Sequence, residues 1–166
     1  MKLKIILTMI FVFSSLHANS QCTPEQSIQL KKTWREFVVA SKTEDPKIMA
    51  SFFKFPLRLL GYYQEDKPLV ISKQFFLKNY KLMFVESQVP GNSDLYAEFE
   101  LVKKLSDEKI LGVSQQRSCG GVNSAHPTIS IGMFRLYWNV NTGWLIQDIY
   151  YSDHDKKILF YMIKNS

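Results

Sequence analysis

The spacing of apolar residues changes once along this chain, and that change restricts the folds open to it. Up to residue 84 the apolar residues recur at the i, i+4, i+7 spacing that places them on one side of a helix. After residue 94 they alternate with polar residues, which is typical of a strand with one buried face. Helices followed by strands predict an α+β fold. The length, 166 residues, suits a single domain.

Three helices are expected in the first half of the chain. Thr23-Pro24-Glu25-Gln26 has the form of a capping box with proline in the first turn. Asp45-Pro46 starts a second helix, which Pro56 should end because a residue before proline disfavours helical geometry. Ser72 can cap a third helix. The apolar stripes of the first and third helices are Leu30, Trp34, Phe37 and Val38, and Phe76, Tyr80, Met83 and Phe84.

The second half is expected to form a meander of antiparallel strands. Leu95, Ala97, Phe99 and Leu101 alternate with polar residues, and Asn141-Thr142-Gly143 reads as a turn between two strands. Residues 153–166 fit a helix and an extension of the sheet equally well. The expected strands are residues 57–63, 95–101, 110–117, 128–140 and 144–151.

Residues 1–20 have the features of a signal peptide. Lys2 and Lys4 precede an apolar run at residues 5–13, and the small residues Ala18 and Ser20 fit a small-x-small cleavage site. The run is too short to cross a bilayer, which takes about 20 apolar residues. We therefore expect cleavage after Ser20 and an exported protein, periplasmic or secreted, that has no membrane span.

The expected mature domain, residues 21–166, keeps both cysteines. Lipidation of Cys22 is disfavoured because Gln21, rather than a small residue, precedes it. An oxidising compartment favours a disulfide between Cys22 and Cys119, the one pairing that two cysteines allow. Two unpaired thiols are the alternative.

The charge and the motifs exclude several classes of function. The chain has 21 Lys and Arg against 15 Asp and Glu, and the surplus is too mild and scattered to indicate a nucleic-acid partner. The motifs CxxC, HExxH, GxGxxG, the P-loop and GxSxG do not occur. We therefore expect neither a metal nor a cofactor.

Three segments resemble the nuclear-transport-factor-2-like superfamily, which has the cystatin-like cone fold. They are Trp34-Arg35-Glu36-Phe37, the stretch from Asp45 to Leu57, and the stretch from Phe134 to Ile146. The resemblance implies N-terminal helices packed on a strongly bent antiparallel sheet, with a pocket at the open end of the cone. Ketosteroid isomerase shares this fold, as do many exported bacterial proteins of unknown role. A shared fold does not transfer a reaction.

Asp148 is the one candidate for catalysis. On a regular strand it would share an apolar face with Trp144, Ile146 and Tyr150, and burial there would make its carboxylate a stronger base for proton abstraction beside a carbonyl. The base and oxyanion-hole motifs of ketosteroid isomerase do not align with this chain. The alternative is a structural Asp148, hydrogen-bonded or paired with a base such as Arg135.

Arg135 and Tyr137 are the candidates for ligand binding. They share a strand face with Ile129, Ile131 and Met133 in the expected long strand, and a lone arginine there could receive a carboxylate ligand bidentately. Structural pairing of Arg135 is the alternative. The residues expected at a ligand site are Arg135, Tyr137, Trp144 and Asp148.

We expect an exported, non-enzymatic binding domain that takes a small hydrophobic ligand or a protein partner through the cone pocket or the sheet face. One alternative is a small isomerase or dehydratase that uses Asp148. Another is a periplasmic immunity or inhibitor protein. The sheet face away from the helices is expected to be apolar and to be covered by a second copy of the chain, in a homodimer, or by residues 158–163.

Overall fold

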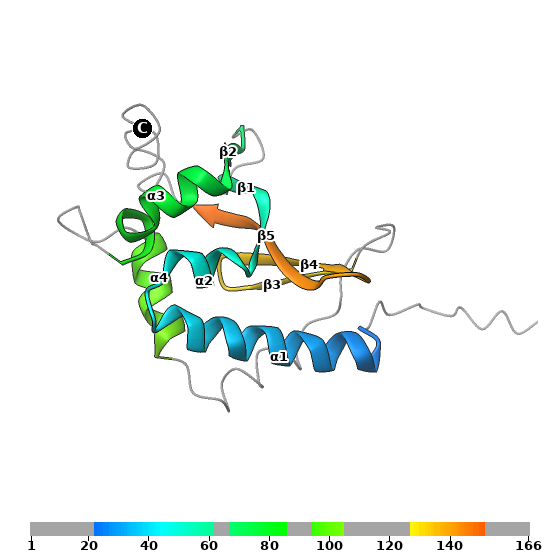
Figure 1. Cartoon of the computed structure of the whole chain (residues 1–166). Helices are drawn as coiled ribbons and strands as arrows, with labels where there is room; N and C mark the ends of the chain where they lie inside the picture. The colour runs from blue at the N-terminus through cyan, green and yellow to red at the C-terminus, as the bar shows by residue number, and fades with distance from the viewer. Residues whose placement is uncertain (1–21, 62–66, 86–93, 105–126, 152–166) are drawn as a thin grey trace, which may run out of the picture.

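Four helices and five strands form the part of the chain described by the structure, a computed structural model (Figure 1). The described residues are 22–61, 67–85, 94–104 and 127–151. The helices are α1 (Pro24–Ser41), α2 (Pro46–Ala50), α3 (Lys73–Phe84) and α4 (Asp94–Lys103). The strands are β1 (Phe53–Gly61), β2 (Leu69–Ile71), β3 (Thr128–Ile131), β4 (Phe134–Asn139) and β5 (Gly143–Tyr151). The α+β class is therefore as predicted.

Several predictions fall on residues outside the described part. They are the signal peptide and its cleavage site, the strand at 110–117, Cys119, and the conformation of residues 153–166. Cys22 lies inside the described part, where it is partly buried against the core. Its disulfide with Cys119 stays a prediction.

The predicted helix starts of α1 and α3 are confirmed. The side chain of Thr23 accepts a hydrogen bond from the backbone N–H of Gln26 at 3.2 Å, and Gln26 Oε1 accepts one from the N–H of Thr23 at 2.9 Å. Ser72 Oγ accepts a hydrogen bond from the N–H of Phe75 at 3.1 Å. Each cap satisfies backbone donors that the first turn of a helix leaves without a partner.

The predicted end of the second helix at Pro56 is wrong. Asp45 caps α2 as expected, but α2 stops at Ala50 and Pro56 lies inside β1. The pairing of β1 with β5 is irregular between Phe53 and Arg58, so Pro56 sits where the ladder is interrupted. Proline lacks an N–H and is tolerated in a sheet at such interruptions.

The predicted strand at residues 95–101 is also wrong, because this segment is helix α4. The same segment also fits the spacing of a helix. Phe99 and Val102, three positions apart, are buried, whereas Leu101, two positions from Phe99, is 60% exposed. Positions three apart share a helix face, whereas positions two apart do not. Packing against α1 and α3 selects the helix.

The single long strand predicted at residues 128–140 is a hairpin of β3 and β4. Ile131 pairs with Phe134, so Gly132 and Met133 form a two-residue turn. Gly132 has φ of +56°, a left-handed conformation that glycine adopts without steric cost. Ile129, Ile131 and Met133 alternate with other residues without a break at this turn, so the sequence pattern alone does not reveal it.

The sheet has the strand order β2-β1-β5-β4-β3. Strands β3, β4 and β5 form an antiparallel meander, as expected for the second half of the chain. Strand β1 pairs with β2 in the antiparallel sense but with β5 in the parallel sense, so the wholly antiparallel sheet that the resemblance implied is wrong. The parallel pair places β5, the last described strand, at the centre of the sheet. It therefore has β1 on one side and β4 on the other.

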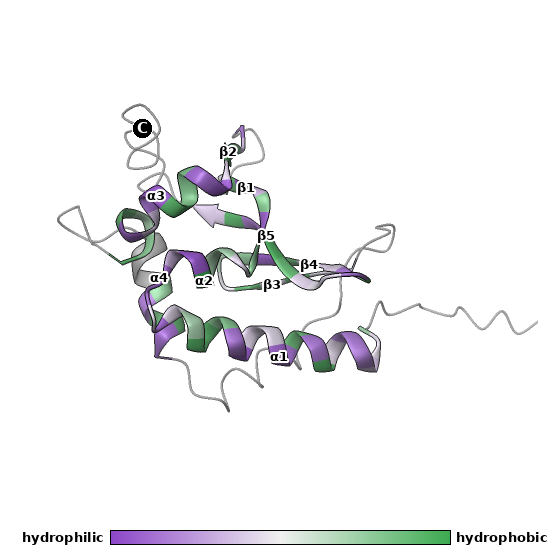
Figure 2. Ribbon diagram, in the orientation of Figure 1, coloured by the Kyte–Doolittle hydropathy of each residue, from purple (hydrophilic) through white to green (hydrophobic). Residues whose placement is uncertain are grey.

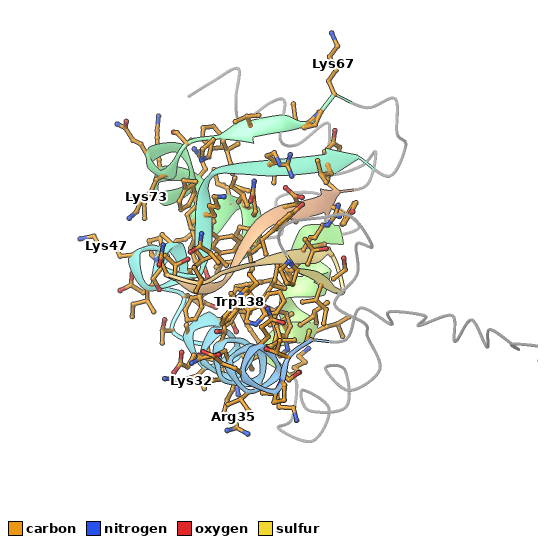
Figure 3. The ribbon with its side chains drawn as sticks, turned by 90° about the vertical axis from the view of Figure 1, so that its right-hand side faces the viewer. Lys32, Arg35, Lys47, Lys67, Lys73 and Trp138 are labelled. Atoms are coloured by element: carbon orange, nitrogen blue, oxygen red, sulfur yellow. The ribbon has the colours of Figure 1, made fainter. Side chains whose placement is uncertain are left out.

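The helices cover one face of this sheet. Aromatic rings of α1 contact β4, since Phe37 lies 5.3 Å from Phe134 between ring centroids, and α3 contacts β1, since Phe76 lies 4.9 Å from Phe53. Figure 2 shows apolar and polar residues mixed along α1, as an amphipathic helix requires. In Figure 3, Trp138 lies where the sheet meets α1, while Lys32 and Arg35 project from α1 away from the sheet.

Candidate functional site

A β-bulge in β5 decides which face of the sheet carries Asp148. Leu136 of β4 pairs with Ile146, but the next residue along, Arg135, pairs with Asp148, so Gln147 is the extra residue. Side chains alternate between faces along a strand, and one extra residue reverses the alternation. Trp144 and Ile146 therefore face the helices, whereas Asp148 faces the opposite side. The single apolar face predicted for these residues is wrong.

We call the side of the sheet away from the helices the outer face. Its residues follow from the cross-strand pairs, which join Arg58 to Asp148, Asp148 to Arg135, and Leu60 to Tyr150. Asp148 is thus flanked by an arginine on each neighbouring strand. The residues of the outer face on the three central strands are Arg58, Leu60, Arg135, Tyr137, Leu145, Asp148 and Tyr150.

The carboxylate of Asp148 is held by Arg58 and Tyr137. Oδ1 accepts a hydrogen bond from Arg58 Nε at 2.6 Å, and Oδ2 accepts one from Arg58 Nη2 at 2.8 Å and one from the Tyr137 hydroxyl at 2.6 Å. The Asp148 side chain is 0% exposed, whereas that of Arg58 is 40% exposed. This bidentate, charge-assisted arrangement is among the strongest side-chain pairings in proteins.

The same contacts shift the pKa values of the two donors. Burial raises the pKa of Tyr137 to about 12, and the hydrogen bond to Asp148 adds to the effect because an ionised phenol would face a carboxylate. The hydrogen bond to Asp148 also raises the pKa of Arg58, although partial burial opposes the rise. Both groups therefore keep their protons at neutral pH.

Arg135 does not take part in this ion pair, even though it is the cross-strand partner of Asp148. Its guanidinium lies 5.5 Å from the centroid of the Tyr137 ring and donates a hydrogen bond from Nη1 to the Tyr150 hydroxyl at 3.4 Å. Among the described residues no carboxylate pairs with Arg135. The structure therefore brings Arg135, Tyr137 and Asp148 together and adds Tyr150 and Arg58.

Trp144 does not belong to this cluster. It is 1% exposed on the helix side of the sheet, packs against Trp138, and donates a hydrogen bond from Nε1 to the carbonyl oxygen of Gln26 at 2.8 Å. Since Gln26 lies in the first turn of α1, Trp144 fastens the start of that helix to the centre of the sheet.

Neither Arg58 nor Tyr150 is among the residues that the sequence predicted for a ligand site. The local pattern Leu57-Arg58-Leu59-Leu60 contains a signal for Arg58, because a single cation inside an apolar strand needs a partner. Its partner Asp148 lies 90 positions further along the chain, and the parallel pairing of β1 with β5 is what brings them together.

A second polar cluster joins α4 to the turn after α1. Lys103 Nζ donates hydrogen bonds to Glu44 Oε1 at 2.8 Å and to Glu100 Oε1 at 2.7 Å. Burial alone would lower the pKa of Lys103, but the hydrogen bonds to the two carboxylates outweigh it and raise the pKa. Every charge in this cluster has a partner, so we regard it as structural. In residues 22–61, 67–85, 94–104 and 127–151, no group of three or more His, Cys, Asp or Glu side chains is placed to hold a metal ion.

The described helices include none that is both long and apolar enough to cross a membrane. Comparison of the chain with protein-family models, with curated proteins and with solved structures finds no match.

Proposed function

We propose that this chain is an exported, non-enzymatic binding domain that docks a protein partner on the outer face of its sheet. Export rests on the features of residues 1–20. A nuclear-transport-factor-2-like fold is part of the proposal, and the packing of the helices on one face of the sheet supports it. A disulfide between Cys22 and Cys119 is part of it as well, since exported proteins seldom leave thiols unpaired.

The observation that carries the proposal is the way the buried Asp148 organises side chains around it. Arg58 and Tyr137 are held by its carboxylate, and Arg135 stacks on the Tyr137 ring. These three side chains are only partly buried, so their outer surfaces remain available for contact. Tyrosine and arginine are enriched in the residues that dominate binding energy at protein interfaces. Side chains already held in place lose little entropy when a partner docks.

The geometry speaks against the enzyme alternative. A general base needs a free oxygen within reach of substrate, but both oxygens of Asp148 accept hydrogen bonds and the side chain is 0% exposed. Because the bulge turns Asp148 away from the helices, it does not line the space between helices and sheet, where a cone pocket would lie. A carboxylate bonded in this way is suited to stabilising the fold and not to proton transfer.

The outer face is also more polar than a homodimer through an apolar sheet would need. Leu136 and Ile131, two apolar residues of the β3–β4 hairpin, are buried on the helix side. In their place the outer face presents two arginines and two tyrosines around Asp148. This composition favours a partner with complementary charge over a second copy carrying the same charges.

Selection of peptides from a random library on the exported chain tests the proposal. The selected peptides should bind the double variant Leu60→Ala, Leu145→Ala about tenfold more weakly, because both side chains belong to the outer face. A matched control, Val39→Ala with Leu101→Ala, removes two exposed apolar side chains from helices instead.

The control variant should bind the peptides as the unchanged chain does. If the helix control weakens binding and the outer-face variant does not, docking takes place on the helices and the proposal fails. Thermal unfolding of each variant shows that it remains folded under the binding conditions.

A further inference from the structure

We propose that Arg135 and Tyr150 form a subsite for a single carboxylate, supplied by an aspartate or glutamate side chain of the protein partner. This inference rests on the proposed function, because it names the chemistry by which the outer face would recognise its partner. Arg135 is the one cation of the cluster that its neighbours do not neutralise.

Arg135 has more hydrogen-bond donors than it uses within the described residues. A guanidinium has five N–H donors, and in the described part of the chain Arg135 uses one of them, to the Tyr150 hydroxyl at 3.4 Å. Arg58, in contrast, directs two nitrogens at Asp148 at 2.6 and 2.8 Å. The fork of Arg135 therefore stays open for a bidentate acceptor, and carboxylate oxygens match its geometry.

The hydroxyl of Tyr150 offers a further donor beside Arg135. The hydroxyl oxygen accepts from Arg135, which leaves the phenolic proton of Tyr150 free to be donated. A carboxylate at Arg135 would thus meet charged donors from the guanidinium and a neutral donor from Tyr150. No bound acceptor within the described residues competes for that proton.

The cluster of Arg58, Arg135 and Asp148 carries a net positive charge. Arg58 and Arg135 bring two positive charges, and Asp148 brings one negative charge, so one positive charge is surplus. A monoanion such as a carboxylate would neutralise the cluster. A dianion such as phosphate would place a second negative charge close to the buried Asp148, where like charges repel strongly.

The side chains of the subsite are already in place before a ligand binds. Arg135 lies over the ring of Tyr137, and the hydroxyl of Tyr137 is bonded to Asp148 at 2.6 Å. The buried carboxylate thus orients Tyr137, and Tyr137 in turn orients Arg135. Asp148 is a positioning residue for the subsite and makes no contact with the ligand.

Titration of the exported chain with two blocked single residues tests this inference. The probes are N-acetyl-glutamate methylamide and its uncharged counterpart N-acetyl-glutamine methylamide, and the signals followed are the arginine Nε–H resonances. The glutamate probe should shift the resonance of Arg135 and leave that of Arg58 nearly unchanged, whereas the glutamine probe should shift neither. Arg135→Gln should weaken binding of the glutamate probe about tenfold or more.

Two further variants sharpen the test. Tyr150→Phe removes the neutral donor and should weaken binding of the glutamate probe by about threefold to tenfold. Lys42→Gln removes an exposed positive charge from the end of α1 and should leave the affinity unchanged. Equal binding of the two probes, an equal loss in Lys42→Gln, or tighter binding of inorganic phosphate than of acetate would overturn the carboxylate subsite.

The carboxylate subsite and the docking face can fail independently of each other. If library peptides dock on the outer face without depending on Arg135, the subsite is wrong and the docking face stands. If the glutamate probe binds at Arg135 while library peptides dock on the helices, the docking face is wrong and the subsite recognises free acids.

Discussion

Arg135 and Asp148 are direct cross-strand partners, yet the carboxylate of Asp148 is bound by Arg58 on the opposite neighbouring strand. Asp148 lies in the central strand and has an arginine at its level on each side. Its two oxygens accept both Arg58 donors and the Tyr137 hydroxyl. Arg58 is therefore paired with the carboxylate of the cluster, whereas Arg135 is not. Both proposals rest on this difference between the two arginines.

Replacing Asp148 with asparagine should destabilise the fold by about 2–3 kcal/mol, because the neutral side chain no longer balances the charge of the Arg58 guanidinium. The 40% exposure of the Arg58 side chain keeps the loss below that of a fully buried pair. Urea unfolding of Asp148→Asn measures it. Glu36→Gln is the control, since its ion pair with Lys32 is exposed and 4.0 Å long, and it should cost less than about 0.5 kcal/mol. Similar losses in both variants would contradict a special role for Asp148.

The phenol of Tyr137 should make stability fall at high pH. Its pKa is about 12 in the folded chain, above the value of about 10 expected in the unfolded chain. A raised pKa means that the folded state keeps a proton that the unfolded state releases, so the contribution is complete below pH about 10 and is lost as pH rises toward 12.

Comparison with Tyr137→Phe isolates this effect. Below pH 10 the variant should be less stable by about 1–3 kcal/mol, the value of a buried hydrogen bond to a charged group. The difference between the two proteins should shrink as pH rises from about 10 to 12. Urea unfolding at a series of pH values measures it, and a difference that grows over that interval would contradict the prediction.

Replacing Trp144 with phenylalanine should weaken the attachment of α1 without changing docking on the outer face. The change removes the 2.8 Å hydrogen bond to the carbonyl oxygen of Gln26 and part of a fully buried ring. We expect a loss of about 1–3 kcal/mol in the free energy of unfolding. Peptide affinity should be unaltered where the variant is folded, and a loss of affinity there would place the ligand on the helix side.

The disulfide predicted between Cys22 and Cys119 should be present in exported protein. Cys22 directly precedes the cap of α1, so a bond there would tie the start of that helix to a distant part of the chain. For a loop of about 100 residues the chain-entropy model gives about 4–5 kcal/mol. Thiol titration should find no free sulfhydryl in native exported protein, and reduction should lower the unfolding temperature. Two titratable thiols in that material would end the prediction.

Local sequence determined the starts of α1, α2 and α3 and the turn between β4 and β5. Thr23, Asp45 and Ser72 act through atoms two or three residues away, so their caps are readable without the rest of the fold. The turn at Asn141-Thr142-Gly143 is equally local, since Gly143 adopts φ of +73°. These features depend on backbone geometry and neighbouring donors alone.

Tertiary structure decided the elements in which two local patterns compete. Residues 95–101 alternate like a strand, yet they lie within helix α4, which packs against α1 and α3. Pro56 resembles a helix stop, yet it lies in β1 where the ladder with β5 is interrupted. In both places the free energy of tertiary packing outweighs a weak local preference. That packing energy cannot be read from a single sequence.

The candidate site depended on tertiary structure most of all. Asp148, Arg135 and Tyr137 could be singled out from sequence because they are polar residues in apolar strands. Arg58 could not be assigned to them, because the parallel pairing of β1 with β5 joins positions 90 residues apart. The extra residue Gln147 then reversed the face of Asp148. A strand's side-chain alternation has a period of two, so a single bulge places Asp148, the candidate base of the enzyme alternative, on the outer face, where its carboxylate is buried.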